Sequence, residues 1–184
     1  IHPIEDFTKP QKEKINVTLI ANPPDIDDSK FERVVTYLRT LAPPAQRNAN
    51  DPSVKRGDIL FNKIGCSNCH IPTLRTGSIT AIDELKNQSI KPYTDLLLHD
   101  MGEGLADGLK DSLASGSEWR TPPLWGIGLT KTVNGNTFFL HDGRARSIEE
   151  AILWHGGEGS ESRKNYSSLS FDEKNDLLNF INSL

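Results

Sequence analysis

The spacing of apolar side chains along the chain predicts a mainly helical protein with long loops. Apolar residues recur at helical spacing in four segments that we expect to be helices, at residues 28–41, 53–64, 148–155 and 171–184. Two consecutive prolines follow the first segment and two consecutive glycines follow the third, and both residue types end helices. Residues 71–135 lack this period and are expected to be mostly loop.

Polar residues mark the expected starts of three of these helices. Ser147 with Glu150, and Ser170 with Glu173, have the spacing of a capping box, in which each side chain accepts a backbone N–H of the other residue. Ser53 is expected to cap the helix at 53–64, because its hydroxyl can accept one of the unpaired N–H groups of the first turn.

Short strands are expected within the loop region. Asn134-Gly135 is a dipeptide typical of a tight hairpin turn, and it predicts a small β-hairpin that joins strands at 131–133 and 137–140. A further short strand is expected at 78–81.

The first 27 residues differ from the rest of the chain. They are polar and interrupted by prolines, with one short apolar run at 15–20. We therefore expect residues 1–27 to be an N-terminal arm or linker and residues 28–184 to be one domain. Because the chain begins at Ile1 rather than Met and shows no signal peptide, we expect a processed or shortened product.

The composition suggests that a bound group completes the core. Of 184 residues only 35% are hydrophobic and 7% aromatic, whereas the chain holds 14 glycines and 11 prolines. A loop-rich chain with so little apolar volume would gain from a large buried cofactor. The net charge of -4, without a basic stripe, argues against nucleic-acid binding. No run of about 18 apolar residues is present, so no membrane span is expected.

The two cysteines belong to one motif, Cys66-Ser-Asn-Cys69-His70, which has the spacing of a covalent haem attachment site. Two thiols bond the porphyrin, and the adjacent imidazole then lies beneath the iron. A thioredoxin-like redox pair would follow a strand in a βαβ pattern, but this motif follows a predicted helix. A structural zinc site would need a second pair of ligands at matching spacing, and the sequence offers none.

The motif defines the expected fold as a cytochrome c-like helical domain with one covalent haem c, and leaves the sixth iron ligand open. The candidates are Met101, which is the only Met, and the four histidines outside the motif, His2, His99, His141 and His155. His155 ends a predicted helix beside two glycines. Met101 lies in a glycine-rich stretch at 101–108, expected to be a loop or a short helical turn. The residues alone do not separate these two.

Several segments resemble the C-terminal half of the di-haem oxidoreductase family, whose members are often labelled thiol oxidoreductases. The family is similar to bacterial di-haem cytochrome c peroxidases and MauG-like enzymes. The resemblance covers residues 28–184 and rests on motifs that occur in the same order. They are Gly65-Cys-Ser-Asn-Cys-His-Ile-Pro-Thr-Leu-Arg-Thr-Gly77, Pro92-Tyr-Thr-Asp-Leu-Leu-Leu-His-Asp-Met-Gly102, Glu118-Trp-Arg-Thr-Pro-Pro-Leu-Trp-Gly126 and Leu140-His-Asp-Gly-Arg-Ala-Arg146.

The resemblance implies roles for individual residues. Cys66, Cys69 and His70 match the second haem motif of the family. Arg120 and Pro122 are implied near that haem, and we expect Trp125 near the ring or as a core aromatic. In the peroxidases the distal ligand is a Met that lies fourteen residues past the His of the His-Asp-Gly element, and in MauG-like enzymes it is a Tyr. Here that element begins at His141, and fourteen residues further along stands His155. The resemblance therefore favours His70/His155 ligation over His70/Met101.

A single haem motif implies the electron-transfer half of a di-haem protein, exported to the bacterial periplasm, with a redox partner or a second haem domain. Two histidine ligands would leave no open position on the iron. The alternative is a peroxidase-like di-haem oxidoreductase with this chain as its C-terminal half, or with its active haem here. The acid–base candidates would then be His99, Asp100, Asp142, Arg144 and Glu158. A haem-stabilised structural module is a third reading. Related peroxidases bind calcium near their domain junction, so a calcium site also stays open.

Overall fold

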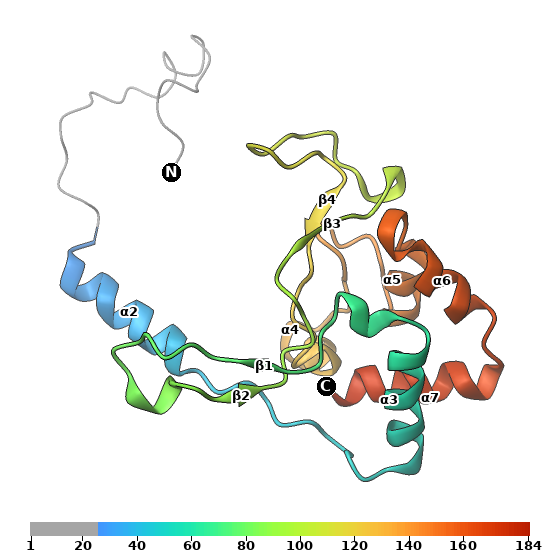
Figure 1. Ribbon diagram of the computed structural model, residues 1–184, viewed down its shortest axis with the longest axis horizontal. Coiled ribbons are helices and arrows are strands. Elements are labelled where there is room, and N and C mark those ends of the chain that lie inside the picture. The colour runs from blue at the N-terminus through green and yellow to red at the C-terminus, as the bar shows by residue number, and fades with distance from the viewer. Residues whose placement is uncertain (1–25) are drawn as a thin grey trace. The chain divides into compact units, whose positions relative to one another are not determined.

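The structure is a computed structural model that describes residues 26–184 (Figure 1). The chain divides into two compact units between Ala42 and Pro43. The predicted apolar run at 15–20 and His2 lie outside the described residues.

The described part of the first unit is the helix α2, Asp28–Thr40. Asp27 caps it by accepting a hydrogen bond from the backbone N–H of Lys30 at 2.9 Å. The helix ends as expected before the prolines. Its apolar stripe is exposed within the described part of the chain; Phe31, Val34, Tyr37 and Leu38 are each about half or more accessible.

The second unit is built around two helices, α3 (Pro52–Lys63) and α7 (Phe171–Ser183), which pack against each other (Figure 1). Gly57 permits the close approach of the two helices, because a Cβ at this position would lie 2.1 Å from the backbone oxygen of Asp176. Asp176 and Phe180 of α7 occupy the space beside Gly57. The core residues are Val54, Leu60, Phe61, Ile64, Tyr93, Leu124, Ile148, Tyr166, Leu177, Phe180, Ile181 and Leu184.

The helix caps agree with the sequence fully in one place, partly in a second and differ in a third. Ser170 and Glu173 form both halves of the capping box of α7. Ser147 caps α5 (Ile148–Trp154) by accepting from the N–H of Glu150, but Glu150 accepts from the N–H of Arg146 instead of Ser147, so only half of the expected box forms. Ser53 was expected to cap α3, and this is wrong. Asp51 is the cap, two residues earlier, because Pro52 is well suited to the first position of a helix and the helix begins there.

The remaining helices are short. The helix α6 (Ser160–Ser167) was not predicted, because Tyr166 is its one buried residue and it has no apolar stripe. It lies next to α5 (Figure 1). A 3₁₀ turn at Glu103–Leu105 confirms the short helical turn expected in the glycine-rich stretch. Further 3₁₀ turns occur at Cys66–Asn68, Asp83–Leu85, Ile127–Leu129 and Gly157–Gly159.

The strands lie elsewhere than predicted. Two antiparallel pairs form, β1 (Leu74–Arg75) with β2 (Ser89–Ile90), and β3 (Leu98–Asp100) with β4 (Glu118–Arg120). In the second pair His99 is opposite Trp119.

The predicted strands at 78–81 and 131–133, and the hairpin between 131–133 and 137–140, are wrong. Residues Thr130–Asn134 form the helix α4 instead, and Gly135 ends that helix with a left-handed φ of 75°. Asn-Gly suits a hairpin turn and a helix end equally well, because both need a residue with positive φ. Of the segment at 137–140, Phe139 alone pairs, in an isolated bridge to Ala145.

The described residues form a mainly α structure with six α-helices and two small sheets. None of the helices in the described part is long and apolar enough to cross a membrane.

Candidate haem-binding site

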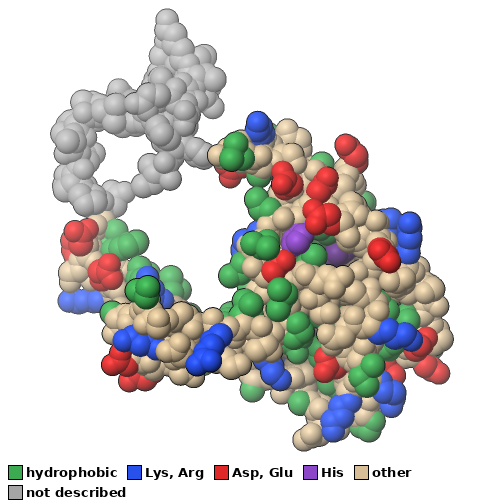
Figure 2. Space-filling model, viewed as in Figure 1, with side chains coloured by type: hydrophobic (Ala, Val, Ile, Leu, Met, Phe, Trp, Pro, Cys, Tyr) green, Lys and Arg blue, Asp and Glu red, His purple; other side chains and the backbone are tan. Residues whose placement is uncertain are grey.

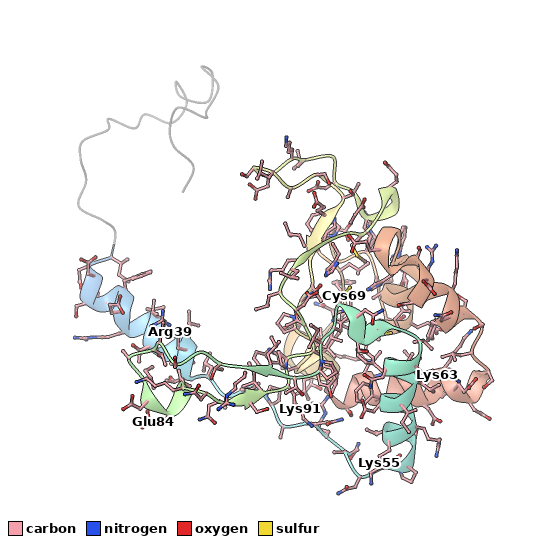
Figure 3. The ribbon with its side chains drawn as sticks, in the orientation of Figure 1. Arg39, Lys55, Lys63, Cys69, Glu84 and Lys91 are labelled. Atoms are coloured by element: carbon pink, nitrogen blue, oxygen red, sulfur yellow. The ribbon has the colours of Figure 1, made fainter. Side chains whose placement is uncertain are left out.

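The two cysteines and His70 share one tight turn just past the end of α3. Lys55 and Lys63 mark the first and last turns of that helix, and Cys69 lies beyond them (Figure 3). Gly65 has a φ of 92°, a left-handed conformation that suits glycine and turns the chain away from the helix axis. The 3₁₀ turn then begins at Cys66, whose carbonyl accepts the N–H of His70 at 3.0 Å.

Both thiols are free and partly buried. Burial raises the pKa of Cys66 to about 12. Burial also raises the pKa of Cys69, and the nearby carboxylates of Asp95 and Glu158 add to this effect. The two sulfurs are therefore protonated thiols near neutral pH rather than a reactive thiolate pair.

The ring of His70 is held from the side by Tyr93. Its Nδ1 lies 3.0 Å from the backbone carbonyl of Tyr93, a residue that is buried and has a φ of 54°. A left-handed φ is uncommon for a residue other than glycine, so this carbonyl is aimed at the ring by an unusual local conformation. Burial lowers the pKa of His70 to about 4. The ring is thus neutral, with Nδ1–H donating and Nε2 free to bind a metal.

The ring of His155 is also held by a backbone carbonyl at its Nδ1. It follows the last residue of α5, and its Nδ1 lies 2.8 Å from the carbonyl of Ala151, one turn earlier in the helix. Burial lowers its pKa as well. The two imidazole rings face each other with their centres 6.5 Å apart and their planes 49° apart.

This separation fits one metal ion between the rings. Two opposed metal–nitrogen bonds of about 2 Å each, with half the width of each ring, give roughly 6 Å between ring centres. The donor set also fits haem iron, which histidine nitrogens can bind, and the thiols of Cys66 and Cys69 belong to the same turn as His70. The ring of Phe61 packs 6.4 Å from His70 and supplies an apolar wall.

Met101 lies close to His155. A Cβ on Gly159 would be 3.3 Å from Cδ2 of His155 and 3.4 Å from Cε of Met101, so both candidates lie against the same glycine. The ring centre of His155 lies 6.5 Å from that of His70.

Two other histidines have different partners. The nitrogens of His99 both bind carboxylates, Asp95 at 2.8 Å and Glu158 at 2.9 Å. The ring of His141 stacks on Trp119, with ring centres 3.5 Å apart and planes within 10°. On the face shown in Figure 2, histidine side chains reach the surface among acidic and apolar side chains.

Arg120, Pro122 and Trp125, which were expected near the haem, all lie at the surface to some extent. Arg120 and Pro122 are exposed, and the buried residue between them is Thr121, whose carbonyl accepts the Thr94 hydroxyl at 2.7 Å. Trp125 is 37% exposed and lines a hollow of about 290 Å³ that Tyr93 also lines. The roles of these three residues at the haem stay a prediction.

The sequence missed a cluster beside the attachment motif. The sulfur of Cys69, a carboxylate oxygen of Asp95 and a ring nitrogen of His99 all lie within 4.8 Å of one another. His99 and Glu158 had been considered separately as acid–base candidates. Nothing in their spacing indicated that they bind each other across 59 positions.

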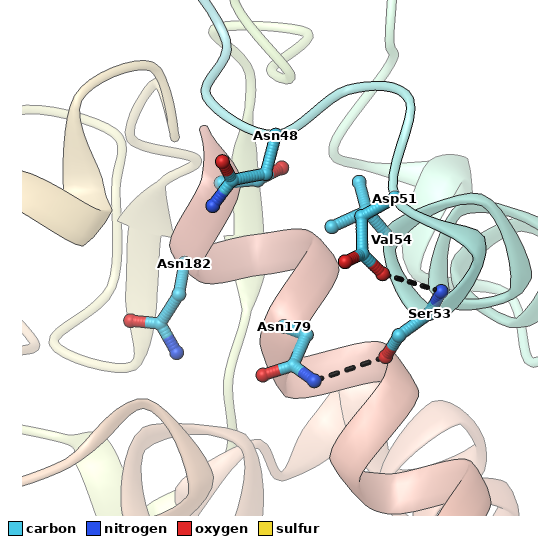
Figure 4. Close-up of a pocket in the computed structure, with 7 residues that line it drawn as sticks. Asn48, Asp51, Ser53, Val54, Asn179 and Asn182 are labelled. Carbon is cyan, nitrogen blue, oxygen red and sulfur yellow. Dashed lines mark hydrogen bonds between the residues drawn. The ribbon is translucent and has the colours of Figure 1, made fainter.

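A second hollow, of about 310 Å³, lies between the loop before α3 and the end of α7 (Figure 4). Its lining is mostly polar. Asp51 accepts the N–H of Ser53 as the cap of α3, and Asn179 of α7 donates to the Ser53 hydroxyl of α3. None of its lining residues belongs to the His70–His155 site.

Comparison with known proteins identifies the family. Residues 19–184 match the family model described as "Di-haem oxidoreductase, putative peroxidase". No curated protein and no solved structure matches the chain. The match covers most of the chain, and the family name implies a haem cofactor and oxidoreductase chemistry. The chain belongs to the di-haem oxidoreductase family.

Proposed function

We propose that residues 28–184 form a c-type cytochrome domain that binds one haem covalently and transfers electrons, with residues 1–27 as an arm. The observation that carries the proposal is the pair of neutral imidazoles, His70 and His155, facing each other at 6.5 Å. The two free thiols of Cys66 and Cys69 beside His70 support covalent attachment. Each thiol would add its S–H across one vinyl group, with one C–S bond formed per cysteine.

The bound iron would supply one-electron redox chemistry. The chain's own residues would then act by holding that iron. The carbonyls of Tyr93 and Ala151 fix the two imidazole planes by accepting the Nδ1–H groups. Two imidazole ligands leave no position for a substrate, and they favour a lower potential than a His/Met pair. This arrangement suits electron transfer rather than substrate binding.

The partner in this proposal is a second haem, in another domain or another protein. The family name implies two haems, and the sequence given holds one attachment motif. Attachment of haem c takes place outside the bacterial cytoplasm, so the proposed location is the periplasm. A net charge of -4 favours a basic surface on the partner.

A second candidate function is that of a peroxidase-like di-haem oxidoreductase, which the family description favours. In that case this chain is its C-terminal half. Among the acid–base candidates, Glu158 binds His99, and Asp142 binds Arg144 at 2.6 Å. These side chains are thus paired with each other in the structure.

Covalent attachment is tested on denatured protein. We expect the haem to remain with the chain on a denaturing gel and in acid–acetone, and the mass to exceed that of the polypeptide by one haem. The variant with Cys66→Ser and Cys69→Ser should release its haem under the same treatment. Extraction of the pigment from the unaltered protein would refute covalent attachment.

The distal ligand is tested by spectroscopy of two matched variants. His155→Ala should convert a low-spin spectrum to high-spin, or allow cyanide or carbon monoxide to bind. Met101→Ala should leave the spectrum low-spin, although Met101 lies against the same glycine as His155. The unaltered protein should reduce peroxide slowly and His155→Ala faster. The reverse pattern, with the Met101 variant alone opening the iron, would assign the ligand to Met101.

A further inference from the structure

A chain of hydrogen bonds runs from Asp95, whose carboxylate lies near Cys69, to the segment that follows His155. Asp95 bonds Nε2 of His99 at 2.8 Å, and Nδ1 of His99 bonds Glu158 at 2.9 Å. Both acceptors are carboxylates, so the ring can make both bonds as a donor only when it carries two N–H groups. The hydrogen bond to Glu158, opposed by burial and reinforced by Asp95, raises the pKa of His99. The three side chains therefore form a carboxylate–histidine–carboxylate bridge, and the raised pKa favours the doubly protonated ring.

One end of this bridge is anchored next to the haem attachment site. The carboxylate of Asp95 lies within 4.8 Å of the Cys69 sulfur. Its side chain is 7% exposed, and its second oxygen accepts the N–H of Leu97 at 2.9 Å. Asp95 is therefore a fixed point on the side of the site that carries His70.

The other end is anchored just past the proposed distal ligand. The second oxygen of Glu158 accepts the N–H of Asp100 at 3.0 Å. His155 is the C-cap residue of α5, so the helix fixes only the chain that precedes it. After His155, Glu158 is the first residue with a side chain that can form a hydrogen bond, because residues 156 and 157 are glycines.

Those glycines make the anchor matter. A Cβ on Gly156 would lie 2.6 Å from the carbonyl oxygen of Met101, and one on Gly157 would lie 2.1 Å from that of Asp100. The segment after His155 thus lies directly on the backbone at 100–102. Because glycines have no side chains, Gly156 and Gly157 cannot hold the segment there by side-chain contacts. Glu158 ties this segment down through two hydrogen bonds.

We propose that His99 and Glu158 are positioning residues, which hold the segment after His155 and so determine how firmly His155 occupies the iron. The inference rests on the proposed function. Without the bridge, the imidazole of His155 leaves the iron more often, and an external ligand that waits for this opening binds faster. Loss of a charge-assisted hydrogen bond should accelerate such binding about tenfold.

The test compares Glu158→Ala, Glu158→Gln and a control in the full-length haem-loaded protein. The control is Glu173→Ala, since Glu173 also accepts a backbone N–H, from Ser170 at 2.9 Å, but lies at the start of α7. The rate of cyanide binding to the oxidised protein is measured by stopped flow, with the optical spectrum and the thermal melt of each variant. We expect faster cyanide binding in Glu158→Ala, a smaller increase in Glu158→Gln, and no increase in Glu173→Ala.

The outcomes separate this inference from the proposed function. A merely structural role of Glu158 would lower the melting temperature in both substitutions and leave the cyanide rate unchanged, which would overturn the inference while a low-spin parent keeps the proposed function intact. A parent protein that is high-spin and binds cyanide at once would overturn both. If Glu158→Ala fails to fold, the Gln variant decides, because its amide oxygen can still accept the Asp100 N–H.

Discussion

The α3–α7 helix pair and the His70–His155 site lie in the same unit but are stabilised by different contacts. Between α3 and α7 the contacts are mostly apolar, from buried side chains such as Phe61 and Phe180. Around the site, the histidine rings are held by backbone carbonyls and the surrounding segments by ionised side chains. Apolar packing contributes chiefly to stability, whereas directional polar contacts fix geometry.

The comparison implies a separation of effects. Substitutions between the helices should change the melting temperature and leave the spectrum of the bound haem alone. Substitutions around the site should change that spectrum or the rate of cyanide binding, and should shift the melting temperature less. The predictions below are arranged from the largest expected effect to the smallest, and each can contradict this separation.

The largest effect is expected from Gly57→Ala. The new Cβ would lie 2.1 Å from a backbone oxygen of α7 and 2.6 Å from Cβ of Phe180, so the helices must move apart. Overpacking of this kind should lower the free energy of unfolding by about 3 kcal/mol. That corresponds to a fall of roughly 10 °C in the melting temperature, measured by circular dichroism.

Gly77→Ala is the matched control for this substitution. The nearest atom to a Cβ at Gly77 is 3.9 Å away, and the residue has no positive φ. Its stability should stay within about 0.5 kcal/mol of the parent. A Gly57 variant as stable as the Gly77 variant would show that the helix pair tolerates wider spacing, and the first half of the comparison would fail.

A smaller, pH-dependent effect is expected at Asp176. Its carboxylate accepts from Arg56 at 2.6 and 2.9 Å and from Ser53 at 2.6 Å. The hydrogen bond from Arg56, followed by that from Ser53, lowers the pKa of Asp176 below its ordinary value. A carboxyl whose pKa is lower in the folded state stabilises the fold above its ordinary pKa, near 4. That stabilisation is lost as the pH falls through the lowered pKa.

Asp176→Asn should therefore melt below the parent at neutral pH, by less than Gly57→Ala, and the difference should shrink at acid pH. The measurement is the melting temperature of both proteins between neutral pH and about pH 3. A difference that stays constant over this range would mean that the charge of Asp176 contributes nothing.

The two regions also differ in how well the sequence predicts them. The helices α3 and α7 could be predicted, because their apolar periodicity and the Ser170–Glu173 capping box are local signals. The strand pair β3–β4 joins segments twenty positions apart, Leu98 with Arg120 at one end and Asp100 with Glu118 at the other, and neither has an alternating pattern. Long-range pairing of this kind leaves no local mark.

The candidate site shows the same limit. The motif at Cys66–His70 predicts its own chemistry from five consecutive residues. Tyr93, whose carbonyl holds the His70 ring, has no sequence signal, because a backbone oxygen is present at every position. The bond between His99 and Glu158 depends on how the glycines at 156 and 157 let two backbones meet, and this follows only from the folded chain.

A third effect, a decrease of about 1 kcal/mol in the free energy of unfolding, is expected from Arg144→Gln. The guanidinium of Arg144 lies 4.8 Å from the ring centre of Trp154 and also donates to the carbonyl of Gly104. Because Trp154 directly precedes His155, we expect a changed tryptophan fluorescence and a small rise in cyanide binding. Arg146→Gln, two positions away and exposed, is the control and should change neither signal.

The smallest effect is expected from His141→Ala, which tests the histidine that begins the His-Asp-Gly element. Its ring stacks on Trp119 at 3.5 Å, so its loss should cost about 0.5 kcal/mol and lower the melting temperature by roughly 2 °C. His141→Phe keeps an aromatic ring on Trp119 and should recover most of this stability. Neither substitution should alter the haem spectrum or the rate of cyanide binding, because the His141 ring stacks on Trp119. A high-spin spectrum in both variants would place His141 at the iron, and the site would then have to be rebuilt around it.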